Sequence, residues 1–150
     1  MLLYHFTARE YLDRIRKAGL TKGDVPLSPA EHPNGVWLTT DKSPSGHGLD
    51  DGHVLTDQER EARALVFGYA PPPGAGVPNK RAIRIKVMIP RNDRSLVAWR
   101  QWGKKHLDPQ WFKTLSKVGG NKDETWFIYF GQIPPDWIVA IDDLEAANAA

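Results

Sequence analysis

The amino-acid sequence predicts one domain of mixed α+β fold over residues 1–150. The clearest strand is the segment 81–89, in which apolar and polar side chains alternate until Pro90 ends the pattern. Helical patterns lie between this segment and strand candidates near both ends of the chain. Because these elements do not alternate regularly, an α+β arrangement is favoured over a doubly wound parallel sheet.

The first predicted helix follows a short apolar opening. Thr7 and Glu10 form a T-x-x-E pattern, in which each side chain can satisfy a free backbone donor at a helix start. This pattern predicts a helix from about Ala8. Gly19 supplies the residue at which that helix ends.

Two more helices are expected in the middle of the chain. A second T-x-x-E pattern at 56–59 predicts a short helix to about Phe67. Asp108 and Pro109 form a cap and first-turn pair for a helix that stops at the glycine pair 119–120. Residues 92–106 fit neither a helix nor a strand clearly.

Besides 81–89, strands are predicted in the apolar opening 2–5 and at 36–40, 125–130 and 137–141. The segment 41–55 has no periodicity and many turn-forming residues, so it is expected to be a long loop. Loops of this length in compact domains are often functional.

The composition limits the possible functions. Twenty Lys and Arg against 18 Asp and Glu give a net charge of +2, which permits a nucleic-acid partner without requiring one. The absence of cysteine excludes disulfides, thiolate zinc sites and a cysteine nucleophile. No stretch approaches the about 20 apolar residues of a membrane helix, and the start lacks a signal-peptide pattern. We therefore expect a cytoplasmic protein with no membrane partner.

The usual catalytic and metal-binding signatures are absent, but the chain has six tryptophans. The five histidines have no C-x-x-C partner and include no i, i+4 pair, so no metal is predicted. Tryptophan fills cores and also lines pockets for flat rings. Trp99, Trp102, Trp111, Trp126 and Trp137 are expected to pack helices on the sheet.

Three separated segments carry residues that suggest a function. His5 ends an apolar strand, Trp37 lies 32 residues later in the strand Gly-Val-Trp-Leu-Thr-Thr, and Glu124 precedes the strand Trp-Phe-Ile-Tyr. In this order the segments resemble the H-Y-E type of the ADP-ribosyltransferase superfamily, which includes poly-ADP-ribose polymerases and diphtheria-like toxins. The sequence departs from that pattern in two places. Trp37 stands where the family has tyrosine, and Glu124 matches the family's glutamate only if a shift of one residue is allowed before the following aromatic residue.

The resemblance implies an ADP-ribosyltransferase-like fold with two small mixed or antiparallel sheets, flanking helices and a cleft for NAD. It also implies that NAD is the substrate and that ADP-ribose is transferred to an unknown acceptor, protein or nucleic acid, with release of nicotinamide. Trp37 would stack on the cationic nicotinamide ring. His5 would bind a ribose hydroxyl, and Glu124 would stabilise the positive charge that develops on the ribose.

Other residues are candidates for NAD binding. The backbone of Phe6 would pair with the carboxamide, and Thr7 follows it on the same strand. Ser43, Ser45 and Tyr129 are candidates for the pocket rim, as is His47.

Each assignment has an ordinary alternative. Trp37 is also explained as a core residue, and Glu124 as a solvated charge at the start of a strand. A cluster of Arg100, Lys104, Lys105 and His106 is explained either as a solvated helix face or as a site for the acceptor or the pyrophosphate of NAD.

Two other functions stay open. One is a non-catalytic module of the same fold that contacts nucleic acid or a protein. The other is an NAD-using enzyme resembling RNA 2′-phosphotransferases, although the arginines show no spacing that we associate with its phosphate site.

Overall fold

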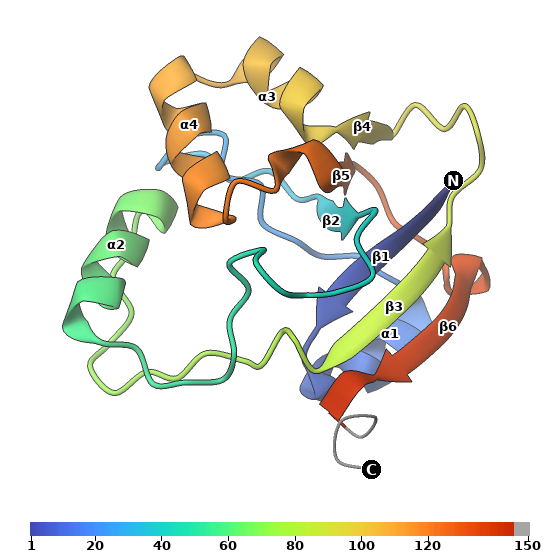
Figure 1. Ribbon diagram of the computed structural model, residues 1–150, viewed down its shortest axis with the longest axis horizontal. Helices are drawn as coiled ribbons and strands as arrows, with labels where there is room; N and C mark the ends of the chain where they lie inside the picture. The colour runs from blue at the N-terminus through green and yellow to red at the C-terminus, as the bar shows by residue number, and fades with distance from the viewer. Residues whose placement is uncertain (146–150) are drawn as a thin grey trace.

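In the computed structural model, which describes residues 1–145, six strands form one antiparallel sheet in the order β4-β5-β2-β1-β3-β6 (Figure 1). The strands are β1 (Leu2–Thr7), β2 (Val36–Thr39), β3 (Ile83–Met88), β4 (Leu96–Ala98), β5 (Trp126–Tyr129) and β6 (Ile138–Asp143). The mixed α+β class predicted from the sequence is confirmed.

The helices are α1 (Leu12–Ala18), α2 (Asp57–Phe67), α3 (Trp99–His106) and α4 (Pro109–Val118). Three short 3-10 turns are η1 (Arg9–Tyr11), η2 (Asp123–Thr125) and η3 (Pro135–Trp137). In Figure 1, α3 and α4 lie at the β4–β5 end of the sheet, α2 lies beside α4, and α1 lies behind β3 and β6. None of the helices in this part of the chain combines the length and apolar character needed to cross a bilayer.

The two halves of the sheet meet at a narrow junction. Strand β1 pairs with β3 along six residues, but with β2 only through Tyr4 and Thr39. The expected division into two separate small sheets is therefore corrected to one sheet, because this single registered pair joins β4-β5-β2 to β1-β3-β6. The strands separate beyond that pair, and the site described below begins there.

The helix start predicted at Ala8 is wrong. Thr7 is the buried last residue of β1, and Ala8 lies in extended conformation with no side-chain cap hydrogen bond. A 3-10 turn follows, so α1 begins only at Leu12. Burial of Thr7 in the strand prevents it from serving as a helix cap.

The other two helix starts are confirmed. The hydroxyl of Thr56 accepts from the amide of Glu59, and the Glu59 carboxylate accepts from the amide of Thr56. Asp108 accepts from the amides of Gln110 and Trp111, both at 3.0 Å, and Pro109 occupies the first turn. These caps satisfy donors that have no partner within the helix.

The predicted strands are all present and differ by one or two residues in their bounds. The ambiguous segment 92–106 contains the short strand β4 followed directly by α3. The last strand starts at Ile138 rather than Trp137, because Trp137 completes the turn η3.

The buried residues form two clusters. One lies between the sheet and α1 and is mainly aliphatic. The other contains Trp99, Ile128 and Leu115, with Trp37 and Trp126 packed against it. This second, aromatic cluster borders the candidate site.

Candidate functional site

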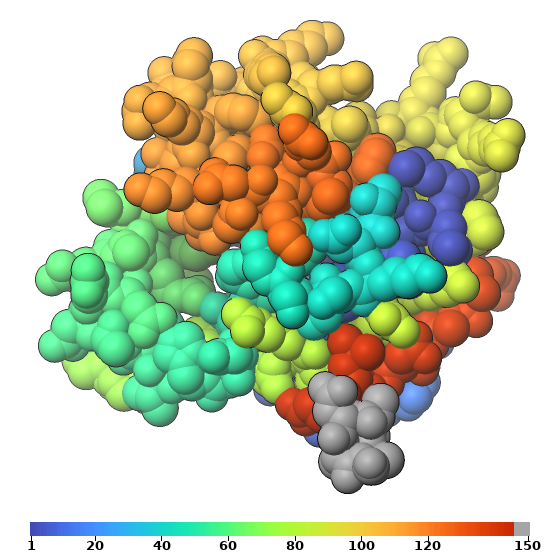
Figure 2. Space-filling view, viewed as in Figure 1, coloured from blue at the N-terminus to red at the C-terminus, as the bar shows by residue number. Residues whose placement is uncertain are grey.

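An apolar cavity of about 230 Å³ lies where β1 and β2 separate. The start of β5 and the ends of α2 and α4 complete its wall together with the segment 47–49, and Figure 2 shows these segments meeting on one face of the molecule. Pockets that enclose a drug-sized ligand have about 300 to 1,000 Å³. The cavity therefore suits a single ring better than a whole dinucleotide.

His5 lies at the separation of the two strands. Its Nδ1 is 2.7 Å from the main-chain oxygen of Trp37. Because a carbonyl oxygen only accepts, Nδ1 carries the proton, and Nε2 of the neutral ring is left as an acceptor. Burial lowers the pKa of His5, although the bond to the Trp37 carbonyl acts in the opposite direction, so the ring is neutral at pH 7.

Three tryptophans from different parts of the chain meet in the cavity wall. The ring of Trp37 lies 5.1 Å from that of Trp99 and 5.7 Å from that of Trp126, the second pair being nearly perpendicular. The Nε1 of Trp37 donates to the main-chain oxygen of Asp24 at 2.8 Å. The orientation of the Trp37 ring is thus fixed by both packing and a hydrogen bond.

His47 holds the loop 41–49 against this wall. The Nε1 of Trp126 donates to Nδ1 of His47 at 2.9 Å, and Nε2 of His47 lies 2.9 Å from a carboxylate oxygen of Asp41. Lys122 approaches the same Asp41 oxygen at 3.7 Å and donates to the main-chain oxygen of Ser45. Burial lowers the pKa of His47, so a neutral ring with its proton on Nε2 satisfies both partners.

Two glycines allow the loop and α4 to come this close. A Cβ on Gly119 would lie 1.5 Å from Cη2 of Trp126. Gly48 has a φ of +68°, and its Cβ would lie 2.1 Å from the main-chain oxygen of Val118. A larger residue at either position would force these segments apart.

The charge in the cavity wall is small. Among residues 1–145, Asp24 is the only formally charged residue that lines it, and Asp24 also lies 3.0 Å from Nδ1 of His32. No Lys or Arg lines the cavity within the described chain. A neutral or cationic flat ring therefore fits this wall, whereas phosphate groups would have to lie outside it.

The structure brings together three of the residues predicted to bind NAD: His5, Phe6 and Trp37 all line the cavity. His47, a predicted rim residue, also lines it. Thr7 is buried at the end of β1 and is not part of the lining.

The other predicted residues lie elsewhere. Ser43 and Ser45 line a second, polar hollow of about 570 Å³ together with Arg81 and Arg84. Tyr129 is buried, and its hydroxyl donates to Asp93 at 2.7 Å. Neither serine nor Tyr129 lines the apolar cavity.

Glu124 lies in the turn before β5 with its side chain 77% exposed. Its carboxylate accepts from Arg100 at 3.0 Å. The next two residues face inward, because the hydroxyl of Thr125 lies 2.9 Å from that of Thr39 and Trp126 lines the cavity. The sequence places Glu124 next to the site, but its carboxylate is not part of the lining.

Trp99 and Trp126 belong to the site, although the sequence led us to expect only packing from them. Trp99 is fully buried in the aromatic cluster and also lines the cavity. The position of Trp126, directly after Glu124 and Thr125, is the one signal that points to it. Nothing in the sequence pairs Trp99 with Trp37.

Comparison with protein-family models, curated proteins and solved structures found no significant match. Among the described residues, no group of three or more His, Asp or Glu side chains is arranged to hold a metal ion. The cavity is therefore the feature of the molecule that indicates a function.

Proposed function

We propose that the protein is an NAD-dependent ADP-ribosyltransferase of ADP-ribosyltransferase-like fold that binds the nicotinamide end of NAD in the apolar cavity. The observation that supports this most directly is the pairing of His5 and Trp37 across the β1–β2 junction. Both side chains line one cavity of ring size. In the proposed complex, the Trp37 face stacks on the nicotinamide ring and attracts its positive charge.

His5 then orients the sugar. Its Nε2 has no hydrogen-bond partner among the described residues, and the bond to Trp37 keeps the proton on Nδ1. A ribose hydroxyl that donates to Nε2 completes the hydrogen bonds of the ring. Because the lowered pKa of His5 keeps the ring neutral, this acceptor is available at pH 7.

The proposed reaction breaks the bond between the ribose and the nicotinamide nitrogen. Nicotinamide leaves with the bonding electron pair and becomes neutral, while positive charge develops on the ribose. A nucleophile of the acceptor forms the new bond and loses its proton to solvent. A carboxylate beside the ribose lowers the energy of this charged state.

Glu124 is the residue proposed to supply that carboxylate. It must first leave Arg100, with which it forms an exposed ion pair. Such pairs contribute only about 0 to 1 kcal/mol, so a small part of the NAD binding energy is enough to release it. Arg100 also has Asp123 within 3.6 Å as a second partner.

The test measures binding and chemistry separately. Binding is followed by NMR saturation transfer from protein to nicotinamide, and chemistry by nicotinamide release from NAD. Glu124→Gln should bind the ring as the wild type does but release at least about tenfold less nicotinamide, a change of about 1.4 kcal/mol in the barrier. Asp123→Asn is the matched control, because it alters the same ion-pair group and should retain release.

His5→Ala should weaken both binding and release. The proposal is overturned if the wild type shows no saturable binding of NAD or nicotinamide. The catalytic assignment alone is overturned if Glu124→Gln and Asp123→Asn release nicotinamide at the wild-type rate.

A further inference from the structure

The net positive charge of this protein comes from one continuous part of the chain. Residues 91–122, here called the basic segment, contain eight Lys or Arg and two Asp or Glu, a surplus of six positive charges. The remainder contains twelve basic and sixteen acidic residues, a surplus of four negative charges. The overall charge of +2 hides this separation, which favours a polyanionic partner.

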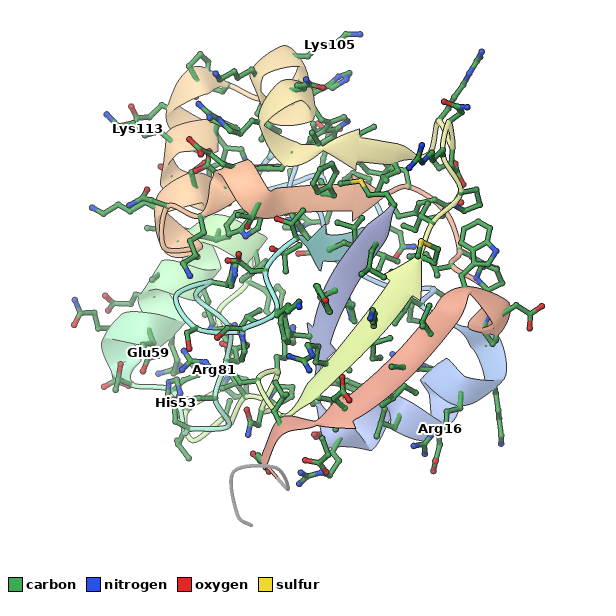
Figure 3. The ribbon with its side chains drawn as sticks, turned by 45° about the vertical axis from the view of Figure 1, so that its right-hand side comes forward. Arg16, His53, Glu59, Arg81, Lys105 and Lys113 are labelled. Carbon is green, nitrogen blue, oxygen red and sulfur yellow. The ribbon has the colours of Figure 1, made fainter. Side chains whose placement is uncertain are left out.

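The basic segment forms one end of the molecule. It comprises the loop before β4, the strand β4, and the helices α3 and α4, which lie together in Figure 1. Figure 3 shows Lys105 and Lys113 projecting outward from α3 and α4. Seven of its cations are exposed: Arg91, Arg94, Arg100, Lys104, Lys105, Lys113 and Lys117.

Acidic neighbours neutralise little of this charge. Arg100 pairs with Asp123 and Glu124, whereas the other six exposed cations form no ion pair with another described residue. The two acids of the segment have structural roles. Asp93 accepts from Tyr129 and from an amide, and Asp108 caps α4.

The helix dipole explains only some of these cations. Lys104, Lys105 and Lys117 lie in last turns, where positive charge is favourable. Arg91 and Arg94 precede β4, and Lys113 lies in the middle of α4. These three have no helix terminus to stabilise.

We propose that the outer surface of the basic segment binds nucleic acid through its phosphate backbone. Aromatic side chains favour nucleic acid over an acidic protein, because bases stack on rings and carboxylates do not. The exposed ring of His106 lies 5.2 Å from that of Trp102, within the same surface. Helix α4 also contributes Leu115 and Val118 to the cavity wall, so this surface adjoins the cavity. The proposal does not depend on NAD chemistry.

The test uses fluorescence anisotropy with labelled 20-nucleotide single strands of DNA and RNA and a DNA duplex. If three cations contact phosphates of the duplex, raising the salt from 50 to 200 mM weakens binding about 40-fold, and six contacts give about a thousandfold or more. The triple variant Lys104→Gln, Lys105→Gln, Lys113→Gln should bind at least about tenfold more weakly.

The matched control is Arg14→Gln, Arg16→Gln, Lys17→Gln. It removes the same charge from exposed positions on α1, at the other end of the molecule, and should bind nearly as the wild type does. Circular dichroism checks that both variants are folded.

Three results would overturn the proposal. One is equal weakening by the two triple variants, and another is the absence of binding at 50 mM salt. The third is that polyglutamate of equal charge or vesicles with anionic lipid compete as well as the oligonucleotide, which would indicate an acidic protein or a membrane surface instead.

Discussion

The indole nitrogen of Trp126 donates a hydrogen bond to Nδ1 of His47 at 2.9 Å. Trp126 begins β5, and His47 lies in the loop 41–49, of which residues 47–49 line the cavity. The bond requires an unprotonated Nδ1, while Nε2–H faces Asp41. The observed position of the loop is therefore linked to a neutral histidine.

This link predicts that acid loosens the loop. Burial lowers the pKa of His47 below the ordinary value of 6.5, so the unfolded chain binds the proton more tightly than the folded one. The stabilising contribution is complete above pH 6.5 and is lost as the pH falls through 6.5 to the folded-state pKa. Amides of Ser43 and of residues 45–49 should exchange faster at pH 5 than at pH 7.5, after correction for the intrinsic rate.

His47→Gln provides the control for this experiment. Its amide does not titrate, whereas Asp41 and Lys122, the charged groups around His47, are kept. The variant should show little pH dependence in this loop. An unchanged pH dependence would assign the effect to another group.

A second prediction concerns the contact between α4 and the cavity wall. Gly119→Ala places a methyl group where Cη2 of Trp126 lies, 1.5 Å from the new Cβ. The φ of Gly119 is −83°, so the effect is steric and not backbone strain. Overpacking of this kind costs about 1 to 3 kcal/mol. Urea unfolding should show this loss, and the binding of nicotinamide should weaken.

Gly76→Ala is the control, because its Cβ would be 3.9 Å from its nearest neighbour, the main-chain oxygen of His53. Equal stability of the two variants would mean that Trp126 moves aside without cost.

Local signals in the sequence predicted more of the fold than of the site. The alternation at 81–89 and the caps at Thr56 and Asp108 act between neighbours in the chain, so they identified elements correctly. Thr7 carries the same signal as Thr56, but burial in β1 overrides it. A capping motif reports only the local preference.

The site was predicted in part for a similar reason. His5 and Trp37 were predicted to lie together because their segments resemble a known pattern. In the structure, Nδ1 of His5 lies 2.7 Å from the main-chain oxygen of Trp37. Trp99, at the start of α3, contacts Trp37 through tertiary packing alone. The spacing of residues along the chain does not predict such a contact. The ion pair of Glu124 with Arg100 depends on the contact between α3 and the turn before β5.

Trp99 leads to a third prediction. Its side chain is fully buried, and its Nε1 has no hydrogen-bond partner among the described residues. A buried unpaired donor costs about 1 to 3 kcal/mol. Trp99→Phe removes this donor together with part of the ring, so it should destabilise the protein much less than Trp99→Ala, for which about 3 to 5 kcal/mol is expected.

Urea unfolding of both variants measures this difference. Trp126→Phe is the comparison, because its indole donor is paired with His47 and its removal leaves an acceptor unsatisfied. If Trp99→Phe is as damaging as Trp99→Ala, the Trp99 donor has a partner in solution and the prediction is wrong.

The histidines themselves provide a fourth prediction. His53 is hydrogen-bonded through Nδ1 to Asp51 and through Nε2 to Glu59 at 2.6 Å, and the nearness of His53 and Glu59 is visible in Figure 3. The bonds to Asp51 and Glu59 raise the pKa of His53, whereas burial lowers that of His5. The stabilisation from the bonds of His53 to Asp51 and Glu59 is therefore present below pH 6.5 and is lost as the pH rises through the folded-state pKa of His53. The effect of His5 on stability has the opposite dependence on pH.

Proton NMR titration of the ring signals measures both values directly. The midpoint of His53 should lie above 6.5 and that of His5 below it. Asp51→Asn should move the His53 midpoint down while leaving His5 unchanged, since Asp51 is not among the groups that act on the pKa of His5. A His5 midpoint above 6.5 would contradict this prediction. A midpoint above pH 7 would also mean that the ring is mostly charged at pH 7, and Nε2 would then be a donor instead of the acceptor that the proposed ribose contact requires.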